Sequence, residues 1–360
     1  MKKGEKTMKK LISLLLVLAM AVGLCACGGA PASAPTASAK PEATEAAPAE
    51  TAAAEPAETN TKVLKMGHVY ADTYAMHIAM KAMSDEVYEK TEGRYRIDIA
   101  PNSTLGGESD LNEGVHIGTI DMSFTATTPL ANIVPKVAFL DMPFLVKDYA
   151  HADAVFFDEN SPVRQYIMDS IDEAGFKCLT LTENGFRQLY TNKPVTSVAE
   201  LKGLKVRTME NALHLELWKT LGASPTPMSA GEAMTGLQQG TIDGVEMFHS
   251  AFVTNFAGLA NYYVGTNHIY TVGTLLLSQR IWNEMSAEDQ AVFMEAAQNM
   301  SKATIEQLRA EDQGYYEQII NELVEGYTIL DQAELEAMVQ PMYEKHSEYK
   351  DILEQIASIG

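Results

Sequence analysis

The side chains that most often carry out enzymatic chemistry are present in this sequence, but their spacing matches no common catalytic motif. There is no His-Glu-x-x-His, no Gly-x-Ser-x-Gly, no P-loop, and no Gly-x-Gly-x-x-Gly that opens a helix. The eight histidines are dispersed, without a close pair at metal-ligand spacing. Cys178 stands in the largely apolar stretch 176–179, which favours an inert buried thiol over a nucleophile. We therefore expect no metal, no cofactor and no enzymatic activity.

One cysteine near the N-terminus points to a different chemistry, the attachment of lipid. Two lysines precede the apolar run 11–24, which is typical of a secretory signal and too short to span a membrane comfortably. The run ends in Leu-Cys-Ala-Cys, and with Leu24 at −3 and a small residue at −1, Cys27 matches a bacterial lipobox. This predicts a signal peptide over 1–26 and a lipid anchor on Cys27. Ordinary signal cleavage nearby is the alternative.

The segment 27–61 has a composition that cannot form a packed core. After Cys27 it consists almost entirely of Ala, Pro, Glu, Thr and Ser, with no aromatic and no branched aliphatic residue. Such a segment cannot bury enough apolar surface to offset the entropy of ordering. Its five prolines also interrupt any Ala-rich helix. We expect a disordered tether between the lipidated cysteine and the folded body.

Length and charge limit the architecture and the partners. A chain of 360 residues suggests about two domains, at roughly 150 residues each. Its formal net charge of −21 argues against nucleic acid as a partner, because phosphate binding needs a basic surface. A small anionic ligand is compatible with this charge, since it needs only a few local positive groups.

Strands and helices alternate in the pattern of the folded body. Short apolar runs predict strands over 63–69, 94–100, 121–126, 176–182, 187–191, 204–208, 241–246 and 270–277. Helices are expected over 73–91, 211–221 and 231–239, and the chain is mostly helical after Ser286, which precedes Asp289 in a capping pattern. Repeated strand–helix–strand units predict sheets covered on both faces. In such sheets, ligands bind beyond the carboxyl ends of the strands.

Six short segments, taken together and in this order, resemble the solute-binding proteins of TRAP transporters, the DctP-like family. They are Leu105–Glu108, Gly118–Asp121, Leu140–Phe144, Glu183–Arg187, Leu201–Arg207 and Leu237–Gly244. The resemblance runs from about residue 63 to residue 289, which is nearly all of the globular body. Each segment alone is a weak signal, whereas the ordered set is specific.

The resemblance implies a fold and a role. The expected fold is α/β, a two-lobe clamshell like the type II periplasmic binding proteins, with a long connecting helix. Lobe one is expected over 61–184 plus 273–312, and lobe two over 185–272 plus 313–360. The implied role is extracytoplasmic capture of a small organic acid anion, a dicarboxylate or a sugar acid. Delivery then goes to a small and a large TRAP membrane subunit, which use a sodium gradient rather than ATP.

Two arginines match arginines of the family. Arg207 matches the one that pairs with a ligand carboxylate, and a planar guanidinium offers two parallel donors to the two carboxylate oxygens. Arg187 matches the second family arginine, with a structural ion pair that supports a hinge strand as the alternative. Other positions are matched more loosely. Tyr70 is a candidate to cover the ligand, and Glu108 is a candidate partner of a ligand hydroxyl. The alternatives are core packing for Tyr70 and a favourable helix-dipole position for Glu108.

Further candidates lie on two other segments. Thr127 and Thr128 follow a strand, where their hydroxyls could donate to a ligand or simply cap a helix. The chain departs from the family after Gly244. The family often has an asparagine that contacts the ligand where this chain has Met247, and a thioether cannot replace an amide. Phe248 and His249 are candidates for replacement contacts, with helix packing as the alternative.

Two other functions stay open at this point. An ABC-type substrate-binding lipoprotein would have similar lobes and would be served by an ATPase. A secreted hydrolase that uses a pair of carboxylates is less favoured, because 48 acidic residues make chance pairs plentiful.

Overall fold

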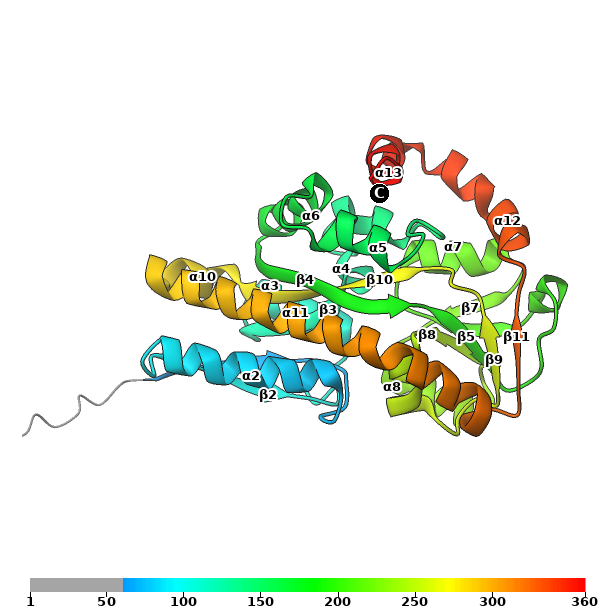
Figure 1. Cartoon of the computed structure of the whole chain (residues 1–360), viewed down its shortest axis with the longest axis horizontal. Coiled ribbons are helices and arrows are strands. Elements are labelled where there is room, and N and C mark those ends of the chain that lie inside the picture. Colours follow the sequence, from blue (N-terminus) through cyan, green and yellow to red (C-terminus); the bar gives the residue numbers. More distant parts are fainter. Residues whose placement is uncertain (1–60, 360) are drawn as a thin grey trace, which may run out of the picture. The chain divides into compact units, whose positions relative to one another are not determined.

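Residues 61–359 are described by the computed structural model (Figure 1). The predicted signal peptide, the Cys27 anchor and all but the last residue of the tether lie outside the described residues. Strands and helices alternate along most of the described chain, as predicted for an α/β protein. None of the helices within 61–359 combines the length and the apolar character needed to cross a membrane.

The first sheet has five strands in the order β2-β1-β3-β10-β4. Their bounds are Tyr95–Ala100 (β2), Lys62–Gly67 (β1), Met122–Ala126 (β3), Tyr270–Ser278 (β10) and Phe176–Phe186 (β4). β1 is parallel to β2 and β3, whereas β10 is antiparallel to β3 and β4. β3 and β10 are buried along their whole length, as expected for central strands of a sheet covered on both faces.

The second sheet has six strands in the order β11-β9-β5-β8-β6-β7. Their bounds are Gly326–Ile329 (β11), Tyr262–Gly265 (β9), Gln188–Thr191 (β5), Gly244–Met247 (β8), Lys205–Thr208 (β6) and Ser224–Pro227 (β7). β7, β9 and β11 are not predicted from the sequence. β7 reads Ser-Pro-Thr-Pro, and its prolines are tolerated because the strand lies at an edge of the sheet.

Helices cover both sheets. In chain order the α-helices are α2 (Ala75–Lys90), α3 (Glu108–Ile117), α4 (Thr127–Leu130), α5 (Tyr149–Ala152), α6 (Pro162–Glu173), α7 (Ala212–Thr220), α8 (Ala230–Gln239), α9 (His249–Ala251), α10 (Gln279–Glu284), α11 (Ala287–Gln318), α12 (Gln332–Lys345) and α13 (Lys350–Ala357). The short 3-10 or π-helical turns are η1 (Pro135–Asp141), η2 (Asp153–Phe157), η3 (Val198–Leu201), η4 (Phe252–Phe256), η5 (Ile319–Leu323) and η6 (Ser347–Tyr349).

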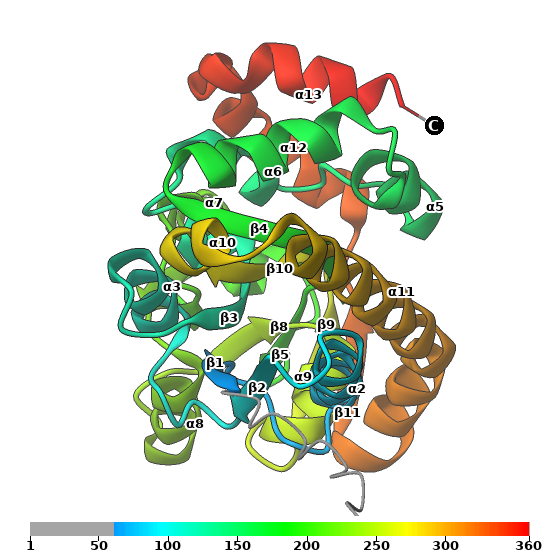
Figure 2. The same cartoon turned by 90° about the vertical axis from the view of Figure 1, so that its left-hand side faces the viewer.

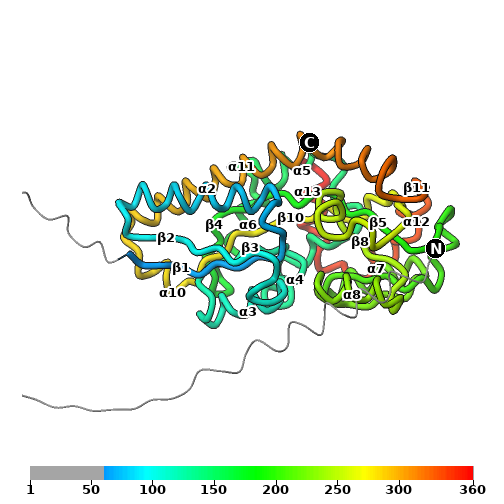
Figure 3. The backbone as a smooth tube through the Cα atoms, turned by 90° about the horizontal axis from the view of Figure 1, so that it is seen from below, coloured from blue at the N-terminus to red at the C-terminus, as the bar shows by residue number. Residues whose placement is uncertain are grey.

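The long helix α11 begins where the sequence predicts a cap. The Ser286 hydroxyl oxygen accepts a hydrogen bond from the Asp289 amide at 3.1 Å, which satisfies one of the free N–H groups of the first turn. α11 then continues for 32 residues. It packs beside α2, and Figure 3 shows the two helices next to each other. The predicted long connecting helix is therefore present.

Strand β4 is longer than the sequence predicts. A strand is expected to end at residue 182, but pairing with β10 continues to Phe186 across a register shift between Thr271 and Val272. This shift is a β-bulge that accommodates an extra residue, and Gly185 next to it takes a positive φ of 106°. The prediction ended the strand too early because the consecutive residues Asn184 and Gly185 favour a turn. A β-bulge tolerates both residue types.

Two short segments connect the sheets. Arg187 alone separates β4 from β5, and residues 266–269 join β9 to β10. The C-terminal α13 packs against α6, as Figure 2 shows. Ile356 of α13 is fully buried, and its carbonyl oxygen lies 3.1 Å from His151 Nε2. The predicted boundaries of the two lobes, which assign α13 to lobe two, stay a prediction.

Candidate functional site

A small cavity of about 50 Å³ collects residues from the carboxyl ends of strands in both sheets. It is lined by Val69, Tyr70, Glu108, Ala126, Asn184, Arg187, Arg207, Met209, Ala230, Met247, Phe248, Ala251, Asn255 and Phe256. Tyr70 follows β1, Ala126 ends β3, Arg207 lies near the end of β6 and Met247 ends β8. The carboxyl ends of parallel strands lie at the same edge of a sheet, so these side chains come close together although they are far apart in sequence.

Arg207 is a buried cation with a free end. Its side chain is only 5% exposed, and its Nε donates to the Met228 carbonyl at 2.8 Å. Its two terminal nitrogens make no hydrogen bond with residues 61–359. Burial lowers the pKa of Arg207 to about 10, while Glu246 and Glu108 act in the opposite direction. The guanidinium therefore stays charged near neutral pH and presents an open pair of donors to the cavity.

Arg187, by contrast, has a counter-charge of its own. Its Nε donates to the Glu246 carboxylate in a buried ion pair, and its Nη2 donates to the Glu246 carbonyl at 2.5 Å. Arg187 is 2% exposed and Glu246 is fully buried. The guanidinium also lies 5.9 Å from the centre of the Phe248 ring. Arg187 lines the cavity, but most of its charge is already compensated by Glu246.

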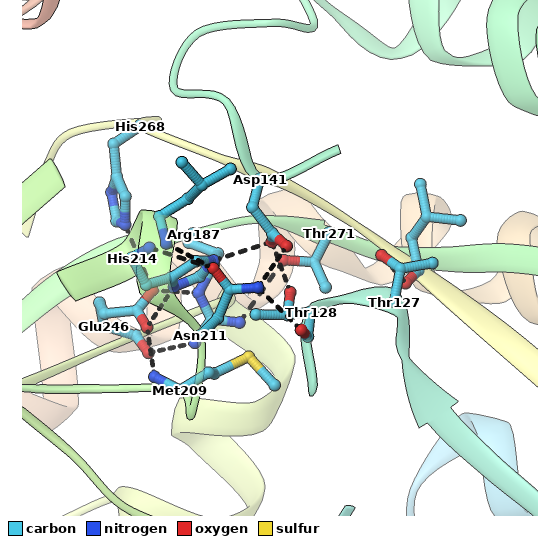
Figure 4. Close-up of polar contacts among 12 residues, drawn as sticks. Thr127, Thr128, Asp141, Arg187, Met209, Asn211, His214, Glu246, His268 and Thr271 are labelled. Carbon is cyan, nitrogen blue, oxygen red and sulfur yellow. Dashed lines mark hydrogen bonds and ion pairs between the residues drawn. The ribbon is translucent and has the colours of Figure 1, made fainter. Parts of the chain in front are cut away.

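Glu246 is the centre of a buried polar network (Figure 4). His214 Nδ1 lies 3.2 Å from its carboxylate, and His268 Nε2 lies 3.3 Å from it. Burial alone would raise the pKa of Glu246, but Arg187 and His214 hold it well below its usual range. Burial also opposes the charged form of His214, yet Glu246 and Asp141 raise the pKa of this histidine above its ordinary value. The network therefore favours an ionised Glu246 between positive groups.

Asp141 extends this network from the 3-10 turn η1. Its carboxylate lies 2.9 Å from His214 Nε2 and accepts a hydrogen bond from Asn211 Nδ2 at 3.0 Å. The Thr128 hydroxyl also donates to it, at 2.7 Å (Figure 4). These contacts connect η1 and α4, which follow strand β3 of the first sheet, with α7, which follows strand β6 of the second. The network therefore fixes the positions of η1, α4 and α7 relative to one another.

Glu108 is the only carboxylate that lines the cavity within the described part of the chain. It begins α3, and its Oε1 accepts a hydrogen bond from the Ala126 amide at 2.8 Å. Burial raises the pKa of Glu108, while the Ala126 amide, Arg207 and Arg187 oppose that rise. Its second carboxylate oxygen has no hydrogen bond from residues 61–359. Glu108 can therefore accept a hydrogen bond from a bound molecule.

Six of the nine ligand-contact residues that the sequence predicts line this cavity. They are Tyr70, Glu108, Arg187, Arg207, Met247 and Phe248. The other three face elsewhere. The Thr127 hydroxyl donates to the Val272 carbonyl at 3.2 Å, and that of Thr128 donates to Asp141. His249 lines a different hollow, with Nδ1 2.9 Å from Asp312. A ligand contact through these three residues stays a prediction.

Three polar or flexible lining residues were missed by the sequence analysis. Asn184 stands inside the segment Glu183–Arg187 that carries part of the family resemblance, so a signal for it existed. Met209 follows Arg207 by two residues, and two residues along a strand return to the same face. Asn255 lies in the π-helical turn η4, which no sequence pattern indicated.

Three larger hollows among residues 61–359 lack such a buried charge. One of about 370 Å³ lies between α2 and β2, one of about 400 Å³ lies around Tyr149, His249 and Asp312, and one of about 420 Å³ lies between Tyr166 and Tyr349. The charged residues that line them are exposed or partly exposed. None of the three offers a desolvated cation without an ion pair, so the cavity at Arg207 is the better candidate despite its small volume. Within residues 61–359, no three His, Cys, Asp or Glu side chains gather as metal ligands.

Comparison with known proteins finds similarity over most of the described chain. The family model described as DctP, bacterial extracellular solute-binding protein, family 7, matches residues 66–351. A solute-binding protein of Verminephrobacter eiseniae is 33% identical over 288 residues, which cover 78% of this chain and 84% of that protein.

Two crystal structures are similar as well. A TRAP periplasmic solute-binding protein of Polaromonas sp. JS666, bound to D-erythronate, has a TM-score of 0.79 and 32% identity. The match covers 82% of this chain and 98% of that one. A TRAP periplasmic solute-binding protein of Xanthobacter autotrophicus Py2, with bound β-D-galacturonate, has a TM-score of 0.78 and 30% identity. That match covers 82% of this chain and 100% of the other.

Proposed function

The chain belongs to the DctP family of bacterial extracellular solute-binding proteins, and from this premise we propose that it captures a small hydroxy acid through Arg207. The predicted family is confirmed, and so is the predicted two-lobe α/β fold of periplasmic binding proteins. The family and the similar structures consist of solute-binding proteins for transport rather than enzymes.

The observation that carries this proposal is the guanidinium of Arg207, which is buried and forms no ion pair with residues 61–359. A buried cation without a paired anion is costly, and a ligand carboxylate would pair with it. The two free terminal nitrogens match the two oxygens of a carboxylate in a bidentate pair. Arg187 contributes positive potential to the same cavity, while its own hydrogen bonds go to Glu246 and to the Thr271 hydroxyl. Arg207 is therefore the anchor, and Arg187 is a supporting residue.

The position of Glu108 favours one class of ligand, an acid with hydroxyl groups and a single carboxylate. Its free carboxylate oxygen would accept a short, charge-assisted hydrogen bond from a ligand hydroxyl. A second carboxylate on the ligand would instead meet a like charge there. The Polaromonas and Xanthobacter proteins bind D-erythronate and β-D-galacturonate, which both combine one carboxylate with several hydroxyls. These observations favour a sugar acid with a single carboxylate over a dicarboxylate.

The volume of the cavity implies movement. Ligand sites commonly have volumes of about 300–1,000 Å³, whereas this cavity has about 50 Å³. A sugar acid enters only if the surrounding elements part first. The short connections at Arg187 and at 266–269 suit a hinge, because few dihedral angles must change. The two lobes would open for the acid, close on it, and present the closed form to the small and large TRAP membrane subunits.

A thermal-shift screen over organic and sugar acids tests this function. A ligand that binds only the folded state raises the melting temperature. At a ligand concentration of about 100 times the Kd, the free energy of unfolding increases by about 2.7 kcal/mol. We expect hydroxy monocarboxylates to produce the largest shifts. We also expect the bound acid to be recovered chemically unchanged from the protein. Dicarboxylates of equal length are the matched controls. Stronger shifts with dicarboxylates would contradict the role given to Glu108, and no shift with any acid would contradict the function.

Membrane attachment through Cys27 is a further part of the proposal. Because one thiol would carry the acyl chains, Cys27→Ser should release the protein from the membrane fraction without unfolding the body. Cys25→Ser is the matched control, since this residue does not fit the lipobox. Fractionation of cells that express each variant measures the effect. A Cys27→Ser protein that stays fully bound to membranes would rule out this anchor.

A further inference from the structure

Asn184 occupies a bulge that turns its side chain away from the regular pattern of β4. In the pairing with β10, Gly185 lies opposite Thr271 and Glu183 lies opposite Val272, so Asn184 is the extra residue between them. Bulges next to binding sites re-aim single side chains in this way. Glu183 pairs with Arg309 of α11, whereas Asn184 lines the cavity at Arg207.

The neighbouring strand leaves room for the Asn184 amide. Gly273 of β10 lies beside it, and a Cβ at this position would come within 3.1 Å of Asn184 Oδ1 and 2.5 Å of the Phe124 ring. A side chain at residue 273 would therefore push against both. The bulge at Asn184 and the glycine at 273 together create a place for one amide group under the cavity.

The hydrogen bonds of this amide are incomplete. Asn184 Nδ2 donates to the Tyr70 hydroxyl oxygen at 3.1 Å. Asn184 Oδ1 is buried and has no partner within residues 61–359. The Tyr70 O–H proton likewise has no acceptor among these residues. A buried polar group without a partner destabilises the folded protein, so such groups call for a reason. The free groups therefore include one acceptor, Asn184 Oδ1, and one donor, the Tyr70 O–H, and both residues line the cavity.

An alcohol is the chemical complement of such a pair, because its oxygen accepts one hydrogen bond and its proton is donated in another. We propose that Asn184 and Tyr70 form a subsite for one hydroxyl group of the bound acid. That hydroxyl accepts a hydrogen bond from Tyr70 and donates one to Asn184 Oδ1. The subsite rests on the proposed function and adds a selective position to it. A hydrogen atom or a methyl group in place of the hydroxyl leaves both protein groups unpaired.

Binding of D-erythronate tests the subsite, together with three analogues that each have one hydroxyl replaced by hydrogen. Wild-type protein should bind one of the analogues about 10- to 100-fold more weakly than erythronate, because two hydrogen bonds are lost. Asn184→Leu should weaken erythronate by the same factor and leave the affinity for that one analogue unchanged. Tyr70→Phe, which keeps the ring stacked on Tyr74, should act in the same direction. Calorimetry measures each affinity.

Tyr190→Phe is the matched control. The Tyr190 hydroxyl is also buried without a partner in the described chain, but it does not line the cavity. This variant should bind all four acids as wild-type protein does. If the Asn184 and Tyr70 variants lose affinity equally for all four acids, the residues have only a structural role. The subsite is then overturned, while the proposed function stands.

Failure of the proposed function has a different signature. If wild-type protein does not bind erythronate, the same design is applied to the hydroxy acid that gives the largest shift in the screen and to its deoxy analogues. A wild-type protein that binds no acid of the screen contradicts the proposed function, and the subsite is overturned with it.

Discussion

Replacing Arg207 by alanine should weaken binding of the organic acid by about two to three orders of magnitude. A hydrogen bond to a charged group contributes roughly 1.5–3 kcal/mol, and a buried carboxylate left unpaired costs more. Each 1.4 kcal/mol corresponds to about a factor of ten in affinity. The folded protein itself should change little in stability, since the variant removes one hydrogen bond to Met228 and also a buried charge that forms no ion pair with the described residues. Calorimetry with the acid found in the screen measures the loss.

Arg207→Lys separates charge from geometry. Lysine keeps the positive charge but loses the planar pair of donors, so it should recover only part of the affinity. Circular dichroism and the melting temperature show whether each variant is folded. Near wild-type affinity in a folded Arg207→Ala protein would mean that the anion binds elsewhere.

Replacing Arg187 by alanine should lower the stability of the folded protein, and this effect should be larger than its effect on ligand binding. The change leaves the fully buried Glu246 without its closest cation. Breaking a buried ion pair by removal of one partner costs about 3–5 kcal/mol. Urea denaturation without ligand measures the change in the free energy of unfolding. Arg187→Lys should be intermediate, because a lysine can compensate the charge but cannot also reach the Glu246 carbonyl in the same fork.

An exposed ion pair provides the control for this second expectation. Arg280 pairs with Glu284 one turn along α10, and the side chains are 58% and 47% exposed. Arg280→Ala should change the unfolding free energy by less than about 0.5 kcal/mol. If Arg187→Ala is as mild as this control and ligand affinity falls steeply, Arg187 is a ligand cation, and the structural role is wrong.

Several features of this protein follow from the sequence because they depend on residues close together in the chain. The cap of α11 at Ser286 and the alternation of strands and helices are local patterns, and the structure confirms them. Arg207 and Glu108 were predicted because they match positions of the family. Each also stands at the end of a strand or the start of a helix, and α/β sheets bind ligands at such positions.

Other features were decided only by the tertiary structure. The pairing of Arg187 with Glu246 joins residues 59 positions apart, so no local pattern shows that one arginine is compensated and the other is free. Thr128 and His249 have residue types that suit a ligand site. In the folded chain, however, the Thr128 hydroxyl donates to Asp141, and His249 Nδ1 lies within hydrogen-bond distance of Asp312. A hydrogen-bonding side chain serves whichever partner the fold places beside it, and that choice depends on contacts distant in sequence.

Asn184 shows the same division within a single segment. The sequence marks Glu183–Arg187 as part of the family resemblance, but it does not say which of these side chains faces the cavity. Strand alternation alone would not decide it, because the bulge against β10 shifts the pattern by one residue. The bulge exists only when β4 and β10 are paired, and these strands are about 90 residues apart in the chain. The residue types therefore came from the sequence, whereas their direction came from a non-local pairing.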